Sequence, residues 1–223
     1  YDQTSVDQHT RIVEIHQPDG KPDILQQIEH GALSVVGGYR NLGRLYRGII
    51  CPTLRQYVLL GDAAAMTDGL INNPAQPDDR WVFTEDNPGR ELTTAAHLAA
   101  ASRVLKGFND TLSARCLDVA RAIFSLDRPV SGRAISSKIH AAIELYMTSG
   151  EKVYKDYILN NESFILKDIR SLGWIIGPVL PKIGNEVLTN SVREAVKSIS
   201  ADIVKQGAET PFGVPYRPHI WGA

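Results

Sequence analysis

Cysteine is nearly absent from this sequence of 223 residues, since Cys51 and Cys116 are the only two and they lie far apart along the chain. This spacing excludes a CxxC metal or redox motif. We expect two reduced, buried thiols, and the alternative is a disulfide between them in an oxidising compartment. Long apolar runs are also missing. No segment reaches the length of about 18 residues that a membrane-spanning helix needs.

An excess of charge of either sign is lacking as well. Lysine and arginine number 24 against 25 aspartates and glutamates, which leaves a formal net charge of −1 at pH 7. No block of like charge occurs along the chain. This balance argues against a nucleic acid or an anionic membrane as the partner. The length suffices for a sizeable core.

Several motifs that would identify an enzyme class do not occur. The sequence contains no HExxH zinc helix, no Walker loop, no GxGxxG and no GxSxG elbow. Its six histidines are not spaced as metal ligands. We therefore interpret each histidine as structural first and expect neither a metal nor a cofactor.

Helical patterns dominate what the sequence does contain. The first helix is expected to begin near Pro22 and to end at the pair Gly37 and Gly38, because glycine favours helix termination. Asn109 is a good N-cap for a later helix. The other helices are expected near residues 91–108, 110–126, 131–150, 151–161, 163–173 and 189–207.

Two segments have the composition of irregular structure. Residues 37–91 are rich in turn-forming residues, with a short helix around Leu54–Asp62, and residues 174–184 form an apolar loop broken by proline and glycine. Strand signals are weak. The sequence therefore predicts an all-α fold of antiparallel helix pairs, either an α-solenoid or an α/α toroid.

Carboxylates and aromatic rings in the loops are candidates for catalysis and for sugar binding. Carboxylates beside aromatic rings can supply the acid and base of a glycosidase, although a solvated turn is the simpler interpretation; they are Asp78, Asp79, Glu85 and Asp86. Rings in loops can stack on the apolar face of a sugar, or they can pin the loops to the helices. These rings are Tyr39, Tyr46, Trp81, Phe83, Tyr216 and Trp221.

Four motifs resemble those of glycoside hydrolase family 9, the cellulase-type endoglucanases, and they follow in that family's order. PDILQQIEHG resembles P-D-hydrophobic-L-D-E-x-x-W-G, and NPG with AHLAAASRVL resembles N-P-G … A-A-L-A-A-A-S-x-x-F. AIELYMTSGEKVYKDYI resembles A-x-x-L-Y-x-A-T-G-D-x-x-Y-L, and TPFGVPYRPHIWGA resembles V-P-Y … W-G-S. RIVEIHQPDGKPDILQQIEHG looks closest to the Bacteroidetes branch. The similarity covers residues 12–155 and 205–223.

The resemblance implies part of an (α/α)6 barrel, whose loops on one face form an open cleft for a β-1,4-glucan. It also implies an inverting mechanism with a carboxylate base in a D-A-G-D motif near the domain's start and an acidic glutamate near its end. Neither motif occurs here, and Gly61-Asp62-Ala63 is in the wrong order. We therefore expect residues 1–223 to be the middle segment of a single catalytic domain, about half of the ring. Residues 1–17 would be an extended lead-in.

The same resemblance suggests substrate-binding residues and no catalytic residue in this chain. The expected substrate-binding residues are Trp221, Tyr216, His219, Trp81 and His140. The chain also departs from the family pattern. Gln26 and Gln27 replace Asp-Glu, His30 replaces Trp, Thr93 replaces Glu and His140 replaces a cleft Trp, while residues such as Ile135 and Ser136 replace an acidic pair that binds calcium in some members. The last departure argues against a metal site.

The function expected is that of a fragment of an inverting endo-β-1,4-glucan hydrolase for cellulose- or xyloglucan-type polysaccharides. Its partners would be a β-glucan and the missing segments of the same domain. The alternatives are a non-catalytic helical module that binds carbohydrate or protein, and another α/α-toroid glycosidase using Asp79, Glu85 or Asp86. The polar first residues lack a signal-peptide core. We expect the full-length protein to be secreted, periplasmic or at the cell surface.

Overall fold

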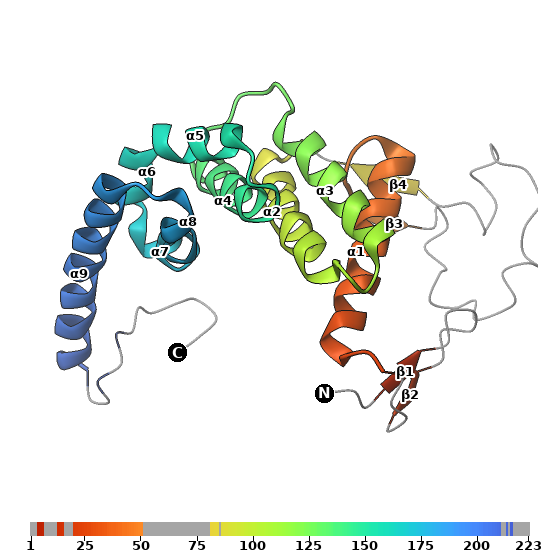
Figure 1. The fold of residues 1–223 in the computed structure, drawn as a ribbon, viewed down its shortest axis with the longest axis horizontal. Coiled ribbons are helices and arrows are strands. Elements are labelled where there is room, and N and C mark those ends of the chain that lie inside the picture. The colour runs from red at the N-terminus through yellow and green to blue at the C-terminus, as the bar shows by residue number, and fades with distance from the viewer. Residues whose placement is uncertain are drawn as a thin grey trace, which may run out of the picture.

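The computed structural model describes residues 4–6, 13–15, 20–50, 81–84, 86–210, 213 and 215. In this part of the chain the helices form an arc from α1 to α9 (Figure 1). The helices are α1 (Asp23–Leu42), α2 (Pro88–Leu105), α3 (Asp110–Phe124), α4 (Arg133–Ser149), α5 (Lys152–Asn160), α6 (Glu162–Lys167), α7 (Ile169–Ile176), η2 (Gly177–Val179), α8 (Leu180–Ile183) and α9 (Glu186–Ala208).

Strands are few and short among these residues, which agrees with the weak strand signals of the sequence. Strand β1 (Thr4–Val6) pairs antiparallel with β2 (Val13–Ile15). Strand β3 (Tyr46–Ile50) pairs antiparallel with β4 (Trp81–Thr84). The expected all-α fold is confirmed, and the two small ladders lie beside it.

Helices α2, α4 and α7 run in the same direction and form a parallel row. Between α2 and α4, Thr93 contacts Ser137 and, one turn later on both helices, His97 contacts His140. Between α4 and α7, Ser136 contacts Asp168, and further along both helices His140 contacts Trp174. Helix α3 returns antiparallel to α2, and α9 returns antiparallel to α7, where Arg170 meets Gln206. The expected cadence of antiparallel pairs is therefore confirmed.

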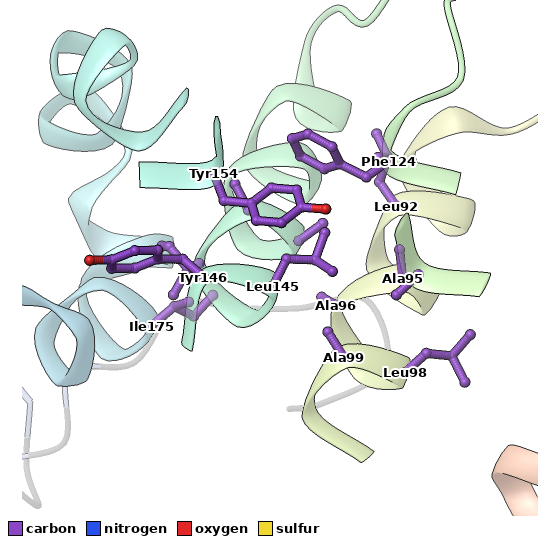
Figure 2. Packing of buried hydrophobic residues seen from close by; sticks show 14 of the residues in the cluster. Leu92, Ala95, Ala96, Leu98, Ala99, Phe124, Leu145, Tyr146, Tyr154 and Ile175 are labelled. Carbon is purple, nitrogen blue, oxygen red and sulfur yellow. The ribbon is translucent and has the colours of Figure 1, made fainter. Parts of the chain in front are cut away.

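The core is continuous and centres on α2, which packs against α3 and α4 on two sides. Ala95, Ala96 and Ala99 are fully buried on α2, and Ala141 and Ala142 are fully buried on α4. Such small side chains let helix backbones approach closely, which larger residues would prevent. Figure 2 shows the alanines of α2 among the larger residues of this cluster.

The turn between α2 and α3 is tied to α1 by one asparagine. Asn109 Oδ1 accepts the amide proton of Leu112 at 3.0 Å, so Asn109 caps α3 as predicted. Its Nδ2 donates to Oε1 of the buried Glu29 on α1 at 2.7 Å. One side chain thus starts a helix and satisfies a buried carboxylate on another.

The expected loop at residues 174–184 is wrong, because α7, η2 and α8 make most of it helical. Pro178 and Pro181 stand in the first turns of η2 and α8, where a missing amide proton costs no hydrogen bond. Lys182 donates to the carbonyl oxygens of Tyr146 at 3.0 Å and Met147 at 2.8 Å. A cation is therefore placed at the C-terminus of α4, where the helix dipole favours it.

Other helix boundaries also differ from those expected. The segment 163–173 is divided at Asp168 into α6 and α7, and α9 begins at Glu186 after an Asn185 cap, earlier than predicted. The short helix expected around Leu54–Asp62 lies outside the described residues. Cys116 is buried and free, as expected, and burial raises its pKa to about 11. Cys51 is not among the described residues.

The largest boundary error concerns α1, which continues through Gly37 and Gly38 to Leu42. It ends at Gly43, which adopts the left-handed conformation and donates its amide proton to the Tyr39 carbonyl. A Cβ on Gly38 would overlap the ring of Tyr46 on β3, whereas a Cβ on Gly37 would meet no atom within 4 Å. Gly38 therefore serves close packing rather than helix termination.

These two adjacent glycines form a matched pair for measurement. Gly37→Ala should raise the free energy of unfolding by up to about 1 kcal/mol, because alanine is the better helix former. Gly38→Ala should lower it by about 1–3 kcal/mol, because the Tyr46 ring must move to admit the methyl group. Urea unfolding of both variants measures the difference, and equal effects would contradict this role of Gly38.

Candidate glycan-binding face

Each helix of the parallel row contributes one ring, and together the three rings form a strip that we name the ring row. The ring row consists of His97 on α2, His140 on α4 and Trp174 on α7. The His97 and His140 ring centroids lie 6.0 Å apart with an interplanar angle of 80°. The His140 and Trp174 centroids lie 5.7 Å apart at 72°. Both contacts are edge-to-face, a preferred geometry of aromatic pairs.

The rings of the ring row differ in how far they are exposed to solvent. The side chain of His140 is only 13% exposed, whereas Trp174 is 71% exposed. A large exposed indole is unusual for an apolar side chain, and here one neighbouring ring contacts it while most of its surface stays free. Such a surface can stack on the apolar face of a sugar ring.

The imidazole of His140 is held in its neutral form. Burial lowers the pKa of His140 below its ordinary value of about 6.5, His97 lowers it further, and the carboxylate of Glu144 acts in the opposite direction. His140 Nε2 lies 3.9 Å from Glu144 Oε1. A neutral imidazole can both donate and accept a hydrogen bond, which suits an uncharged hydroxyl-bearing ligand.

Polar side chains flank the ring row toward the C-terminal ends of α2 and α4. Arg103 donates to Glu144 Oε2 and to Thr148 Oγ1, both at 2.7 Å. Thr148 in turn donates to the Ala99 carbonyl at 2.8 Å. These contacts fix Glu144 near His140, and they place a carboxylate and a guanidinium beside the rings.

The structure brings one predicted substrate-binding residue, His140, into this face. Trp81 lies in β4, where its backbone pairs with Ile50. The predicted residues Tyr216, His219 and Trp221 lie outside the described part of the chain. Sequence reasoning missed His97 and Trp174. Trp174 opens the segment 174–184, whose composition predicts a loop, and the tryptophan itself is the signal that could have identified it.

Of the three carboxylates that the alternative glycosidase would use, Asp86 lies in the described part of the chain, and it is paired with an arginine. The side chain of Asp86 is 81% exposed, and one of its oxygens lies 3.4 Å from Arg128 Nη1. Arg128 is 17% exposed and also pairs with Glu91, whose side chain is 5% exposed. Burial and the charge of Glu91 raise the pKa of the nearby Tyr39, while Arg128 lowers it. These ion pairs hold the loop between α3 and α4, which contains Arg128, against the first turn of α2 and the residues before it. Asp79 and Glu85 are not described.

Within the described ranges, no three histidine, cysteine, aspartate or glutamate side chains come together as a group able to hold a metal ion. Among the helices in those ranges, none combines the length and the apolar character needed to cross a membrane.

A parallel row of helices, each followed by an antiparallel partner and arranged in an arc, defines a segment of an α/α toroid. The family model described as Glycosyl hydrolase family 9 matches residues 55–176, more than half of the chain. The chain therefore belongs to glycoside hydrolase family 9. The match includes α2 and α4 entirely and ends at the last residue of α7. No curated protein and no solved structure matches the chain significantly.

The buried pair of Glu91 and Arg128 gives a prediction about stability. Glu91→Gln should lower the free energy of unfolding by about 3 kcal/mol, because it leaves the Arg128 charge largely buried without its main partner. Asp86→Asn removes an exposed partner of the same arginine and should cost less than about 1 kcal/mol. Guanidinium unfolding of both variants measures these values. Similar losses would contradict the dominance of the buried contact.

The lowered pKa of His140 predicts how stability depends on pH. Between the folded pKa and about 6.5, the unfolded chain binds a proton that folded His140 does not, so this site destabilises the fold as pH decreases through that range. His140→Gln should remove this contribution, so the stability of this variant should decrease less steeply as pH falls. Unfolding midpoints of both proteins at several pH values below 7 test this, and identical slopes would contradict it.

Proposed function

We propose that this chain forms one wall of the substrate cleft of an inverting endo-β-1,4-glucan hydrolase. Membership of the family supports a glycoside hydrolase with a glucan substrate. The observation that carries the proposal further is the exposed Trp174, held at the edge of His140 on a face shared by three parallel helices. We place one glucosyl unit on this indole. Trp81, at the start of β4, and the C-terminal residues Tyr216, His219 and Trp221 would be further contacts.

The polar surroundings of the ring row suit such a unit. A glucosyl ring presents apolar C–H groups on its faces and hydroxyl groups at its rim. Trp174 would take one face, and the neutral His140 would donate to or accept from a hydroxyl. Glu144, already held by Arg103, adds an acceptor close by. A neutral polysaccharide therefore fits this face better than a charged one.

The catalytic acid and base are proposed to lie outside residues 1–223. Inversion requires two carboxyl groups about 6.5–9.5 Å apart, one ionised and one protonated, with a water molecule between them. The sequence has no D-A-G-D motif, and Asp86 is engaged by Arg128. In this proposal, residues 1–223 are a partial catalytic domain. The other segments of that domain are its partner, and the full-length protein acts outside the cytoplasm.

Glycan binding by the chain tests this proposal. Trp174→Ala should weaken binding of a cello-oligosaccharide by roughly 5–30-fold, because the loss of a stacking platform removes about 1–2 kcal/mol. Val187→Ala is the matched control, since Val187 on α9 is similarly exposed but lies away from the ring row. Isothermal titration calorimetry measures both. A chain that binds no β-1,4-glucan, or equal affinities of both variants, would contradict the proposal.

The same preparations address catalysis. The chain should release no reducing sugar from mixed-linkage glucan, xyloglucan or carboxymethyl cellulose, because binding a substrate without stabilising the transition state does not raise kcat. A longer chain that includes the D-A-G-D and glutamate segments should release it. Turnover by residues 1–223 alone would contradict the assignment of acid and base to other segments.

A further inference from the structure

A hollow lies between α1 and α3, two helices that carry no part of the ring row. These helices pack against each other at one end of the arc (Figure 1), and the hollow has a volume of about 380 Å³. Small-molecule sites commonly have volumes of about 300–1,000 Å³. The lining residues include Tyr39, Arg40, Gly43, Arg115, Asp118 and Val119, and we name this hollow the α1–α3 pocket.

Two arginines of the α1–α3 pocket have no partner in the described part of the chain. The guanidinium groups of Arg40 on α1 and Arg115 on α3 make neither an ion pair nor a hydrogen bond there. Other arginines in the same ranges do contact a carboxylate, a side-chain oxygen or a carbonyl group, and they are Arg90, Arg103, Arg121, Arg128, Arg170 and Arg193. Each of the two helices thus contributes an unpaired cation to the same hollow.

The other lining groups leave a net positive charge in the α1–α3 pocket. Asp118 adds one carboxylate against the two cations, and its Oδ1 lies 3.8 Å from Nη1 of Arg121, which balances part of its charge. Burial and the charge of Glu91 raise the pKa of Tyr39, so its phenol stays uncharged at neutral pH. The Tyr39 carbonyl, at the C-terminal end of α1, already accepts the amide proton of Gly43. The pocket therefore favours an anion.

An apolar wall restricts the kind of anion that fits. Val119 is 5% exposed and lines the pocket together with Ala122, one turn further along α3. Arg115 precedes Val119 by one turn, so the cation and the apolar side chains lie along one face of the helix. A guanidinium group forms paired hydrogen bonds with a planar carboxylate. The pocket thus offers a place for a carboxylate and, beside it, an apolar surface.

We propose that the α1–α3 pocket binds a small organic carboxylate with an apolar body. The carboxylate accepts hydrogen bonds from Arg40 and Arg115, and the body packs against Val119 and Ala122. Such a ligand joins α1 to α3, so its binding also stabilises the folded chain. The site goes beyond the proposed function, because it shares no residue with the ring row and needs no glycan.

Three probes separate charge from apolar contact: benzoate, its neutral counterpart benzyl alcohol, and inorganic phosphate, an anion without an apolar body. Two-dimensional NMR of the 223-residue chain follows the amides of Gly43, which lines the pocket, and Gly150. These glycines form a matched pair, because each ends a helix in the left-handed conformation and donates to a tyrosine carbonyl. Benzoate should shift the Gly43 amide saturably and leave Gly150 unchanged. Benzyl alcohol should shift neither, and phosphate should bind more weakly than benzoate.

Substitution of the two arginines tests the proposed contacts. Arg40→Gln and Arg115→Gln should each weaken benzoate binding by roughly tenfold, because each removes a charge-assisted hydrogen bond. Arg133→Gln is the matched control. Arg133 on α4 is also exposed and has no partner in the described part of the chain, but it lies outside the α1–α3 pocket. This variant should bind benzoate as the wild type does.

Each outcome supports or overturns the site. Saturable benzoate binding that both pocket variants weaken and the control variant retains would support it. An unshifted Gly43 amide, or an equal loss of affinity in Arg133→Gln, would overturn it, because the attraction would then be absent or general to the charged surface. Phosphate or benzyl alcohol binding as tightly as benzoate would also overturn it. None of these results depends on cello-oligosaccharide binding, so the pocket and the proposed function can fail separately.

Discussion

The close packing of α2 against α3 and α4 is the constraint on which the rest of the structure depends. Because Ala95, Ala96 and Ala99 carry only a methyl group, α4 can lie alongside α2 in the parallel direction. Parallel packing keeps residues at equal heights on the two helices opposite each other. His97 therefore meets His140, and Arg103 reaches Glu144 and Thr148 further along. The polar and aromatic contacts of the candidate glycan-binding face therefore depend on the apolar packing between α2 and α4.

The candidate face also includes Trp174 on α7, and a different contact fixes the position of this helix. Lys182 and Tyr146 hold each other reciprocally: Lys182 Nζ donates to the Tyr146 carbonyl, and the Tyr146 hydroxyl donates to the Lys182 carbonyl at 3.1 Å. The lysine ammonium also lies 5.2 Å from the centroid of the tyrosine ring. These contacts join α8 to the C-terminal end of α4. They limit how far α7, and with it Trp174, can move relative to His140.

The sequence predicted the features that depend on local patterns. Helical spacing and the Asn109 cap identified α3, and the alanine-rich segment identified the closely packed α2. Prediction failed where a distant contact decided the outcome. Gly38 resembles a helix terminator until Tyr46 is known to lie against it. Pro178 and Pro181 resemble loop residues, yet buried Val179 and Ile183 draw the segment onto the core as short helices.

In the candidate site too, the sequence predicted only what a local pattern covers. His140 was found because a family motif covers it, but no local pattern shows that His97 and Trp174 lie on either side of it. Their association requires three helices to be parallel and in register, which is a property of tertiary packing. Conversely, Asp86 stands beside aromatic residues in the sequence and resembles a catalytic carboxylate. In the structure Asp86 pairs with Arg128. Arg128 is held in place by its second ion pair, with the buried Glu91.

A rigid platform on fixed helices determines how this face would contribute to hydrolysis in the proposed function. Trp174 is held by helix packing rather than by a mobile loop, so a ligand gains contact area without the entropic cost of ordering the platform. Binding of this kind stabilises the bound glycan and its transition state alike, and by itself it does not raise kcat. Its value lies in orientation: a glycan fixed at one unit presents its neighbouring bonds to acid and base groups at defined distances. In the proposed function, this face therefore positions a glycan chain for cleavage, and the chemistry comes from carboxyl groups arranged around it.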